Sequence, residues 1–320
     1  MYFCGMKRMN VFFASQRGTS RPYKETITVF RSWLTLALSL SCVMLLTTAC
    51  GGKTDDETLS REEQQRLQRE EQQALKVAVM PTLDCLPMFL AKDMGLFDTL
   101  KVDVRLKMYA AQMDIDTALL RNRVELGVTD RVRHERMVKA GAKLSELTAL
   151  PSTWMLVSNK DARLKNVNQL GDKMVAMTRF SATDMLTDKS LEGVKTKAQV
   201  FRVQINDVGL RLRMILGGTM DAAWLPEPQA TQAVADGHVL MARSGDIDTN
   251  LGRMVCRTEE MAEARRSQQF NLFMKAYNQA VDSVNRNGAG HYADVVKRWC
   301  GVDDKAVKKM PSVKFEKINE

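Results

Sequence analysis

The distribution of apolar residues divides this chain into three parts. Residues 32–52 form an uncharged stretch with an apolar centre at 33–46, whereas residues 51–73 contain almost no apolar side chain. From Leu75 onward, short apolar runs alternate with amphipathic segments, which is the pattern of strands alternating with helices. The chain is therefore predicted to begin with an apolar leader, to continue through a polar segment and then to form an α/β fold.

Two successive series of strands and helices are predicted after Leu75. The first has strands at 75–80, 102–108, 125–129 and 144–150 and helices at 86–94, 114–121 and 131–140. The second has strands at 154–158, 174–177, 199–203, 222–225 and 239–242 and helices at 183–191, 207–216 and 228–236. After 253–256 the chain becomes helical, at 259–287 and 292–300, and these helices are expected to pack back on the first series.

These two series predict a two-lobed α/β fold in which each lobe is a mostly parallel sheet flanked by helices. Lobe 1 is expected to comprise residues 75–152 with 244–320, and lobe 2 residues 153–243, so the chain crosses between the lobes twice. Ligands of open α/β sheets bind at the carboxyl ends of the strands. The ligand cleft is therefore expected between the lobes.

The leader ends in a cysteine that changes the expected location of the protein. Arg31 precedes the apolar stretch, and Cys50 follows Ala49 and precedes two glycines. This arrangement resembles a bacterial lipoprotein signal, which implies cleavage after residue 49 and acylation of Cys50. A transmembrane anchor is the alternative, because the stretch approaches the ~20 residues of a spanning helix. The first 28 residues match no part of a leader, which suggests a translation start near Val29.

Residues 50–74 are then interpreted as the lipidated cysteine and a solvated tether, with a capping box at Ser60 and Glu63 that favours a helix. The folded part is expected in the cell envelope, lipid-anchored to a membrane and facing the periplasm.

Charge and cysteine content exclude several function classes. The net charge is +9, but residues 1–49 hold six basic side chains against one acidic one, so only about +4 remains afterwards and nucleic-acid binding is not indicated. Cys85, Cys256 and Cys300 lie far apart without a CxxC spacing, which argues against a zinc site or a disulfide scaffold. His134, His238 and His291 are expected on the surface, and no cofactor or metal is expected.

Four segments carry a resemblance to a known family. They are residues 86–92 with 95–97 and 102–104, residues 118–120 with 125–130, residues 166–173, and, most sharply, the Gly-Thr-Met-Asp-Ala-Ala-Trp-Leu-Pro-Glu-Pro run at 218–228. Together they resemble type II periplasmic solute-binding proteins of the ABC importers for aliphatic sulfonates, taurine, nitrate and thiamine-precursor pyrimidines. One departure is Thr178-Arg179-Phe180-Ser181, where the family often has Gly-Ser.

The resemblance implies a function without catalysis. It implies a monomeric, membrane-anchored lipoprotein that captures a small polar or nitrogen-bearing solute and delivers it to an ABC transporter permease. The alternative is an extracytoplasmic enzyme on the same fold that acts on a heterocyclic precursor. Such an enzyme would need clustered histidine, cysteine or carboxylate groups in the cleft, which the sequence does not indicate.

The candidate ligand-binding residues lie at or after the carboxyl ends of predicted strands, at the edge that faces the cleft. They are Thr82, Asp84, Thr183, Asp184, Asn206, Trp224 and Glu227. Each has a structural alternative: Asp84, Asp184 and the Asn206-Asp207 pair could cap helices, and Trp224 could belong to the core. Glu227 is favoured as functional because it lies between two prolines. Since Asp84, Asp184, Asp207 and Glu227 are acidic, an amine or aminopyrimidine is expected in preference to a sulfonate, with Trp224 or Phe180 stacking on a ring.

Overall fold

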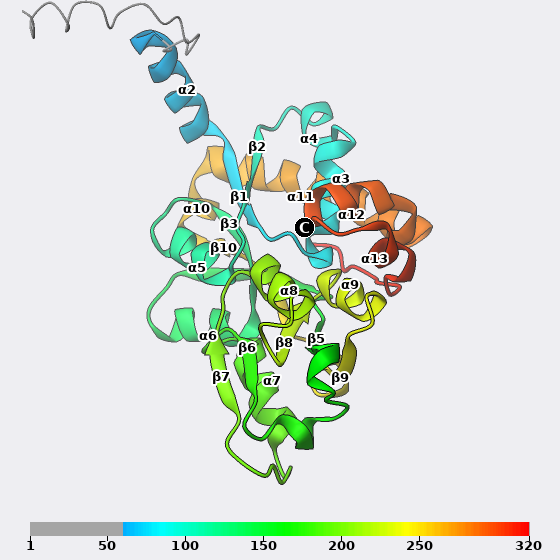
Figure 1. Ribbon diagram of the computed structural model, residues 1–320. Coiled ribbons are helices and arrows are strands. Elements are labelled where there is room, and N and C mark those ends of the chain that lie inside the picture. The colour runs from blue at the N-terminus through cyan, green and yellow to red at the C-terminus, as the bar shows by residue number, and fades with distance from the viewer. Residues whose placement is uncertain (1–59, 320) are drawn as a thin grey trace, which may run out of the picture. The chain divides into compact units, whose positions relative to one another are not determined.

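Two five-stranded sheets organise the chain from Leu75 onward (Figure 1). The computed structural model describes residues 60–319. The first sheet has the order β2-β1-β3-β10-β4 and is built from β1 (Leu75–Val79), β2 (Val104–Met108), β3 (Leu126–Asp130), β4 (Leu144–Leu150) and β10 (Gly252–Arg257). In this sheet β1 is parallel to β2 and β3, and β10 is antiparallel to both β3 and β4.

The second sheet repeats this plan in the order β7-β6-β8-β5-β9. Its strands are β5 (Trp154–Ser158), β6 (Met174–Met177), β7 (Phe201–Gln204), β8 (Ala222–Pro226) and β9 (Val239–Arg243). Here β6 is parallel to β7 and β8, while β5 is antiparallel to β8 and β9. In each sheet one strand therefore opposes the direction of the others, and the predicted two-lobed fold with mostly parallel sheets is confirmed.

Helices of the first lobe cover its sheet. They are α3 (Leu86–Asp93), α4 (Leu96–Thr99), α5 (Gln112–Leu120), α6 (Arg131–Lys139), α10 (Thr258–Ala262), α11 (Ala264–Asn287), α12 (Ala293–Cys300) and α13 (Asp304–Lys309). All of them except α6 and α10 contribute side chains to one apolar core with the sheet. Figure 1 shows α11 and α12 beside α3, as expected for C-terminal helices that return to the first sheet. The helix predicted at 259–287 is interrupted at Glu263, whose backbone is extended.

Local sequence accounts for several of the boundaries. Gly95 has φ of 64°, a left-handed conformation that costs glycine little, and it separates α3 from α4. Asp130 accepts from the N–H of Arg133 at 3.0 Å and so caps α6. In the second lobe, the helices are α7 (Ala182–Leu191), α8 (Val208–Leu216) and α9 (Gln229–Ala235). Asp207 caps α8 by accepting from the N–H of Leu210 at 2.8 Å, so its expected capping role is confirmed.

The chain passes between the sheets twice, after β4 and after β9. At the first crossing the Oγ of Ser152 lies against Gly252, where a Cβ atom would come within 2.1 Å of that oxygen and 2.6 Å of the Leu150 carbonyl. Only glycine fits there, so the two crossing segments are tightly packed where β10 begins. Residues 244–251 form the second crossing and include a short 3₁₀ turn, Ser244–Asp246.

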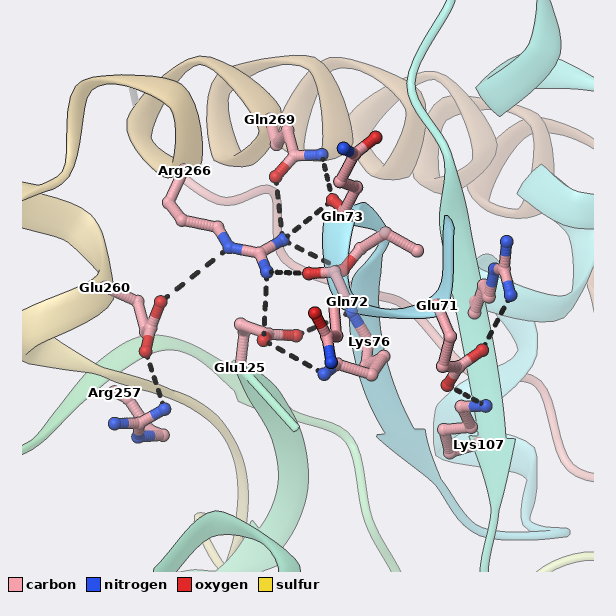
Figure 2. A network of polar contacts seen from close by, with 12 residues as sticks. Glu71, Gln72, Gln73, Lys76, Lys107, Glu125, Arg257, Glu260, Arg266 and Gln269 are labelled. Carbon is pink, nitrogen blue, oxygen red and sulfur yellow. Dashed lines mark hydrogen bonds and ion pairs between the residues drawn. The ribbon is translucent and has the colours of Figure 1, made fainter. Parts of the chain in front are cut away.

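The polar segment before β1 is helical and its last turn is bonded to the first lobe. Helix α2 (Arg61–Gln73) begins at the predicted capping box, where Ser60 Oγ accepts from the Glu63 N–H at 3.2 Å, and none of its residues is buried. Glu71 pairs with Arg105 at 2.6 Å and with Lys107 at 2.5 Å. Figure 2 shows these ion pairs beside a second group of contacts around Arg266. The end of the segment is therefore part of the folded lobe.

Arg266 of α11 holds that end of the helix from the other side. Its guanidinium donates to the carbonyls of Gln72, Gln73 and Ala74 at 2.8, 3.1 and 2.8 Å (Figure 2). It also lies 3.5 Å from Glu125, a buried carboxylate that accepts from the backbone N–H of Lys76 at 2.7 Å. The last carbonyls of a helix have no partner within the helix, and Arg266 supplies one.

Residues 1–59 lie outside the described part of the chain, and with them the predicted signal, the acylation of Cys50 and the alternative of a transmembrane anchor. Within residues 60–319, no helix combines the length and the apolar character needed to cross a membrane.

Candidate functional site

A small cavity lies between the two sheets, at the edge where their parallel strands end. It encloses about 20 Å³, the space of roughly one water molecule. Its lining comes from both lobes: Met80, Thr82, Asp84, Gln112, Val128 and Thr129 from the first, and Trp154, Thr178, Thr183, Asn206, Val208, Arg211 and Pro226 from the second. Four of the predicted site residues, Thr82, Asp84, Thr183 and Asn206, are thus brought together here. The cavity has the position at which α/β sheets bind ligands.

Asp84 presents the carboxylate of the first-lobe wall. Its Oδ1 accepts from Thr82 Oγ1 at 2.5 Å, and its Oδ2 accepts from Ser152 Oγ at the first crossing. Helix α3 is not capped by Asp84, because Cys85 holds the N-cap position and makes no side-chain capping bond. Asp84 therefore connects the loop after β1 to the crossing segment, directly beside the cavity.

The loop between β6 and α7 forms part of the second-lobe wall. The hydroxyl of Thr183 accepts from the N–H of Thr178 at 3.0 Å, and Ser181 caps α7 through the N–H of Thr183 at 3.1 Å. Phe180 in the same loop has φ of 58°, a conformation that glycine adopts more easily than phenylalanine. Phe180 belongs to the segment where the sequence departs from the family's Gly-Ser. The Phe180 side chain is exposed to solvent on one side, and the guanidinium of Arg136 lies 4.0 Å from the centre of its ring.

Arg211 is a buried cation on the second-lobe wall that sequence reasoning did not propose. Its Nε donates to the carbonyl of Ile205 at 2.6 Å, Nη1 to that of Trp224 at 2.9 Å, and Nη2 to Thr178 Oγ1. Only 3% of Arg211 is exposed, and burial lowers the pKa of its guanidinium to about 10. Its three hydrogen-bond acceptors are neutral oxygens, and the charge of Asp207, which caps the same helix, favours its charged form. It therefore remains a buried positive charge at the cavity.

A signal for Arg211 was present in the sequence. The buried residues of α8 are Val208, Arg211, Leu212 and Ile215, which recur with the spacing of one helix face. An arginine within that apolar stripe is unusual, because arginine is almost never fully buried unless it is paired. Gln112, Thr129 and Thr178 are further cavity residues that were not predicted; each is a common surface or core residue type, and no local pattern distinguishes it.

The other three predicted site residues do not line this cavity. Trp224 is fully buried in the core of the second lobe, and its Nε1 donates to Thr187 Oγ1 at 3.0 Å. Trp224 is therefore a core residue, the structural alternative given for it, and its prediction as a ligand-binding residue at the cleft was wrong. Asp184 accepts from the N–H of Phe180 at 2.9 Å and pairs with Arg202 at 3.0 Å, so its carboxylate is used within the lobe.

Glu227 lies at a separate cavity of about 80 Å³, which it shares with Thr82, Asp84, Ser152 and residues 311–313. Its carboxylate accepts from the N–H of Thr231 at 3.2 Å and from Thr231 Oγ1 at 2.9 Å, which fastens the first turn of α9. Pro228 holds the N-cap position of α9, so Glu227 precedes the helix and is bonded to it through Thr231. Burial raises the pKa of Glu227 above its ordinary value.

His238 also differs from expectation. It is buried rather than exposed, and its Nδ1 accepts from the backbone N–H of Lys160 at 3.2 Å. Burial lowers the pKa of its imidazole. It does not line the cavity between the sheets, where Asp84 is the carboxylate and neither histidine nor cysteine contributes.

Solved structures resemble this fold over most of its length. The alkanesulfonate-binding protein SsuA from Xanthomonas axonopodis pv. citri, bound to MOPS, superimposes with a TM-score of 0.63 at 18% identity, covering 74% of this chain and 82% of that one. The periplasmic nitrate-binding protein NrtA from Synechocystis PCC 6803 gives a TM-score of 0.62 at 14% identity, covering 77% of this chain and 74% of its own. At these identities the likeness establishes the fold.

The aliphatic sulphonate binding protein SsuA from Escherichia coli is similar to the same degree, with a TM-score of 0.60, 16% identity and coverage of 75% and 80%. No curated protein sequence matches the chain. The family model described as "NMT1/THI5 like" matches residues 82–287, which include every strand of the two sheets except β1. The chain belongs to the NMT1/THI5-like family.

Proposed function

We propose that this protein is an extracytoplasmic solute-binding protein that captures a small polar or nitrogen-bearing solute and delivers it to the permease of an ABC importer. The observation that carries the proposal is the cavity whose wall is shared by two lobes at the carboxyl ends of their strands. The names of the similar structures support it, since they are binding proteins for alkanesulfonates and nitrate. A cavity with one carboxylate and no histidine or cysteine suits binding better than catalysis.

The proposed motion is the opening and closing of the lobes about the two crossing segments. A cavity of about 20 Å³ holds roughly one water molecule, so a larger solute requires the lobes to separate before it enters. Closure is then stabilised by contacts that the solute makes with both walls at once. Ser152 and Gly252, at the first crossing and the start of β10, are packed too closely to flex independently.

The proposal includes a lipid anchor at Cys50 and a monomeric protein in the periplasm. The support for the anchor is the leader with its terminal cysteine, since an acyl chain at Cys50 would hold the binding domain beside the membrane of the permease. Mass spectrometry of the membrane form should find cleavage after Ala49 and an acylated Cys50. A Cys50→Ser variant should remain uncleaved or appear in the soluble fraction, and an unmodified Cys50 in the wild type would contradict the anchor.

Thermal shift with a broad panel of solutes tests the binding role. The full chain in detergent is screened against aminopyrimidines, thiamine, polyamines, taurine, alkanesulfonates, nitrate, amino acids and sugars. A solute at a hundred times its Kd should stabilise the protein by about 2.7 kcal/mol. Asn206→Ala, at the cavity, should weaken the response, whereas Asn168→Ala, on the surface of the same lobe, should not. A response equally insensitive to both variants, or the absence of any response, would overturn the proposal.

A further inference from the structure

The carboxylate of Asp130 is buried where a helix of the first lobe meets a helix of the second. Asp130 is the last residue of β3, and none of its surface is exposed. Its Oδ1 accepts from the N–H of Arg133 and so caps α6 in the first lobe. Helix α7 of the second lobe contacts α6, and the backbone N–H of Ala182, its first residue, favours the charged carboxylate. Asp130 is therefore a contact between the lobes as well as a helix cap.

The second oxygen of this carboxylate lacks a partner. Oδ2 of Asp130 is enclosed and has no hydrogen-bond partner among the residues that the structure describes. A buried carboxylate is costly unless donors or a cation satisfy both of its oxygens, whereas the protonated form carries no charge that must be removed from water. This contact between the lobes therefore favours the neutral form of Asp130 more than water does.

Charges from the first lobe oppose one another at Asp130. Arg133 of α6 favours the charged carboxylate, but its guanidinium is paired with Asp116 of α5, whose charge acts in the other direction. The residue opposite Asp130 on β10 is Gly252, which has no side chain. Burial is the largest influence, and it raises the pKa of Asp130 to about 7.

Other charged side chains on the neighbouring elements are paired or exposed. The paired ones lie next to Asp130 in the chain, beside Gly252 on β10 and in the first turn of α7: Arg131 with Asp248, Arg253 with Glu146 and Asp184 with Arg202. Arg136 of α6 and Arg179 before α7 are exposed, and His134 of α6 is half-buried. Within residues 60–319, Asp130 itself forms no ion pair.

Separation of the lobes would expose this carboxylate. Helix α6 moves with the first lobe and α7 with the second, so opening takes the amino end of α7 away from Asp130 and admits water to Oδ2. In water the pKa of an aspartate is about 3.9, and the amino end of α6, which Asp130 continues to cap, favours the charged form. The open form therefore holds the proton less tightly than the closed form.

We propose that closure of the lobes takes up one proton at Asp130, so that the affinity for the solute depends on pH. This inference rests on the proposed binding function and names a regulation of it. Because the closed form binds the proton more tightly, the contribution of Asp130 to closure is complete in acid and is lost as the pH rises toward 7. Between about pH 4 and 7 the Kd should rise about tenfold per pH unit, the limit for one proton.

Calorimetry across this pH range tests the linkage on the full chain in detergent. Taurine, nitrate and putrescine are suitable probes, because each keeps one charge state between about pH 5 and 7. For each of them that binds, the Kd should rise about tenfold per pH unit. Titrations in two buffers of different ionisation enthalpy should find about one proton taken up per bound probe near pH 6. A Kd that is constant over this range would overturn the proposal.

Variants assign the proton to Asp130. Asp130→Asn keeps an oxygen that can cap α6 but cannot ionise, so it should abolish the pH dependence and retain near pH 7 the affinity that the wild type shows in acid. His134→Gln and Asp248→Asn are the controls and should keep the wild-type slope. Bonds from the Asn250 N–H and from Arg131 lower the pKa of Asp248, so it remains ionised throughout. A slope that persists in Asp130→Asn would overturn the assignment.

Hydrogen exchange gives a second measurement that requires no solute. After correction for the intrinsic effect of pH, exchange at the amides of residues 182–184 should accelerate in the wild type as the pH rises from about 5 to 7, but not in Asp130→Asn. Equal protection across this range would overturn the linkage, whether or not a solute is found. Binding with a constant Kd would overturn the linkage and leave the binding role intact, whereas pH-dependent exchange without binding by any solute would overturn the binding role alone.

Discussion

Replacing Arg266 with methionine should loosen the junction between α2 and the first lobe. Only 6% of the side chain is exposed, and its guanidinium donates to the carbonyls of Gln72, Gln73 and Ala74 and lies 3.5 Å from Glu125 (Figure 2). Methionine fills a similar volume but cannot donate a hydrogen bond. The substitution therefore isolates the polar contacts of this residue.

The size of the effect follows from what each partner loses. Removing one member of a buried ion pair costs about 3–5 kcal/mol when the other charge is left alone. Glu125 is not left alone, because the backbone N–H of Lys76 remains at 2.7 Å and the Lys76 ammonium at 3.5 Å. Gln72 and Gln73 are exposed, so water replaces Arg266 at their carbonyls. We expect the free energy of unfolding to fall by about 3 kcal/mol, the lower end of that range.

The neighbouring Arg265 provides a matched control. It also donates to the carbonyl of Gln73, at 3.2 Å, but 48% of its side chain is exposed and its ion pair with Glu263 is on the surface. Arg265→Met should therefore change the free energy of unfolding by less than about 1 kcal/mol, the usual range for exposed pairs.

Urea unfolding of both variants, followed by circular dichroism, measures the difference. With an m-value near 3 kcal/mol per molar, the expected loss moves the midpoint of Arg266→Met by about 1 M. Amide hydrogen exchange at Gln73–Lys76 should accelerate in the same variant, because these residues lose their anchor. Midpoints that agree within 0.2 M for the two variants would refute the reasoning, as would unchanged exchange at these amides.

Three further predictions concern buried groups. Burial raises the pKa of Asp130 to about 7 in the folded chain, above its unfolded value of about 3.9. The free energy of unfolding should therefore fall by about 1.4 kcal/mol for each unit that the pH rises between 4 and 7. Asp130→Asn should flatten this slope in urea titrations, and an unchanged slope would contradict the prediction. Trp224→Phe removes the hydrogen bond to Thr187 and should lower the free energy of unfolding by about 1–3 kcal/mol. The Kd of a bound solute, measured by calorimetry, should not change, and a tenfold weaker Kd would show that Trp224 contributes to binding. Gly252→Ala places a Cβ against Ser152 and should lower the thermal midpoint by several degrees, and an unaltered midpoint would show that the crossing segments can yield.

The fold could be predicted from sequence because its determinants are local. The alternation of strands and helices, the left-handed Gly95, the cap at Asp207 and the capping box at Ser60 each depend on a few neighbouring residues. Loops that follow parallel strands meet at one edge of a sheet, so the convergence of Thr82, Asp84, Thr183 and Asn206 also follows from the order of elements.

The direction and surroundings of individual side chains were decided by packing between distant segments. Trp224 occupies the core because the strand β8 is central in its sheet and Thr187 of α7 provides a partner for the indole N–H. The carboxylate of Glu227 accepts from Thr231, four residues later, and the two prolines beside Glu227 did not allow this hydrogen bond to be predicted. The docking of the end of α2 depends on Arg266, almost two hundred residues later in the chain.

The charged groups at the cavity show most clearly what the sequence predicted and what only the tertiary structure decided. Counting acidic residues near predicted strand ends suggested a cationic solute, because the sequence shows which charges are present but not which are already paired. In the folded chain Asp184 and Asp207 are bonded within their own lobe, whereas Arg211, in the apolar stripe of α8, donates only to neutral oxygens and feels the charge of Asp207. Local periodicity predicted the sheet edge at which the cavity lies, and the tertiary structure decided which charged groups line it, because the partners of each charge come from distant segments of the chain.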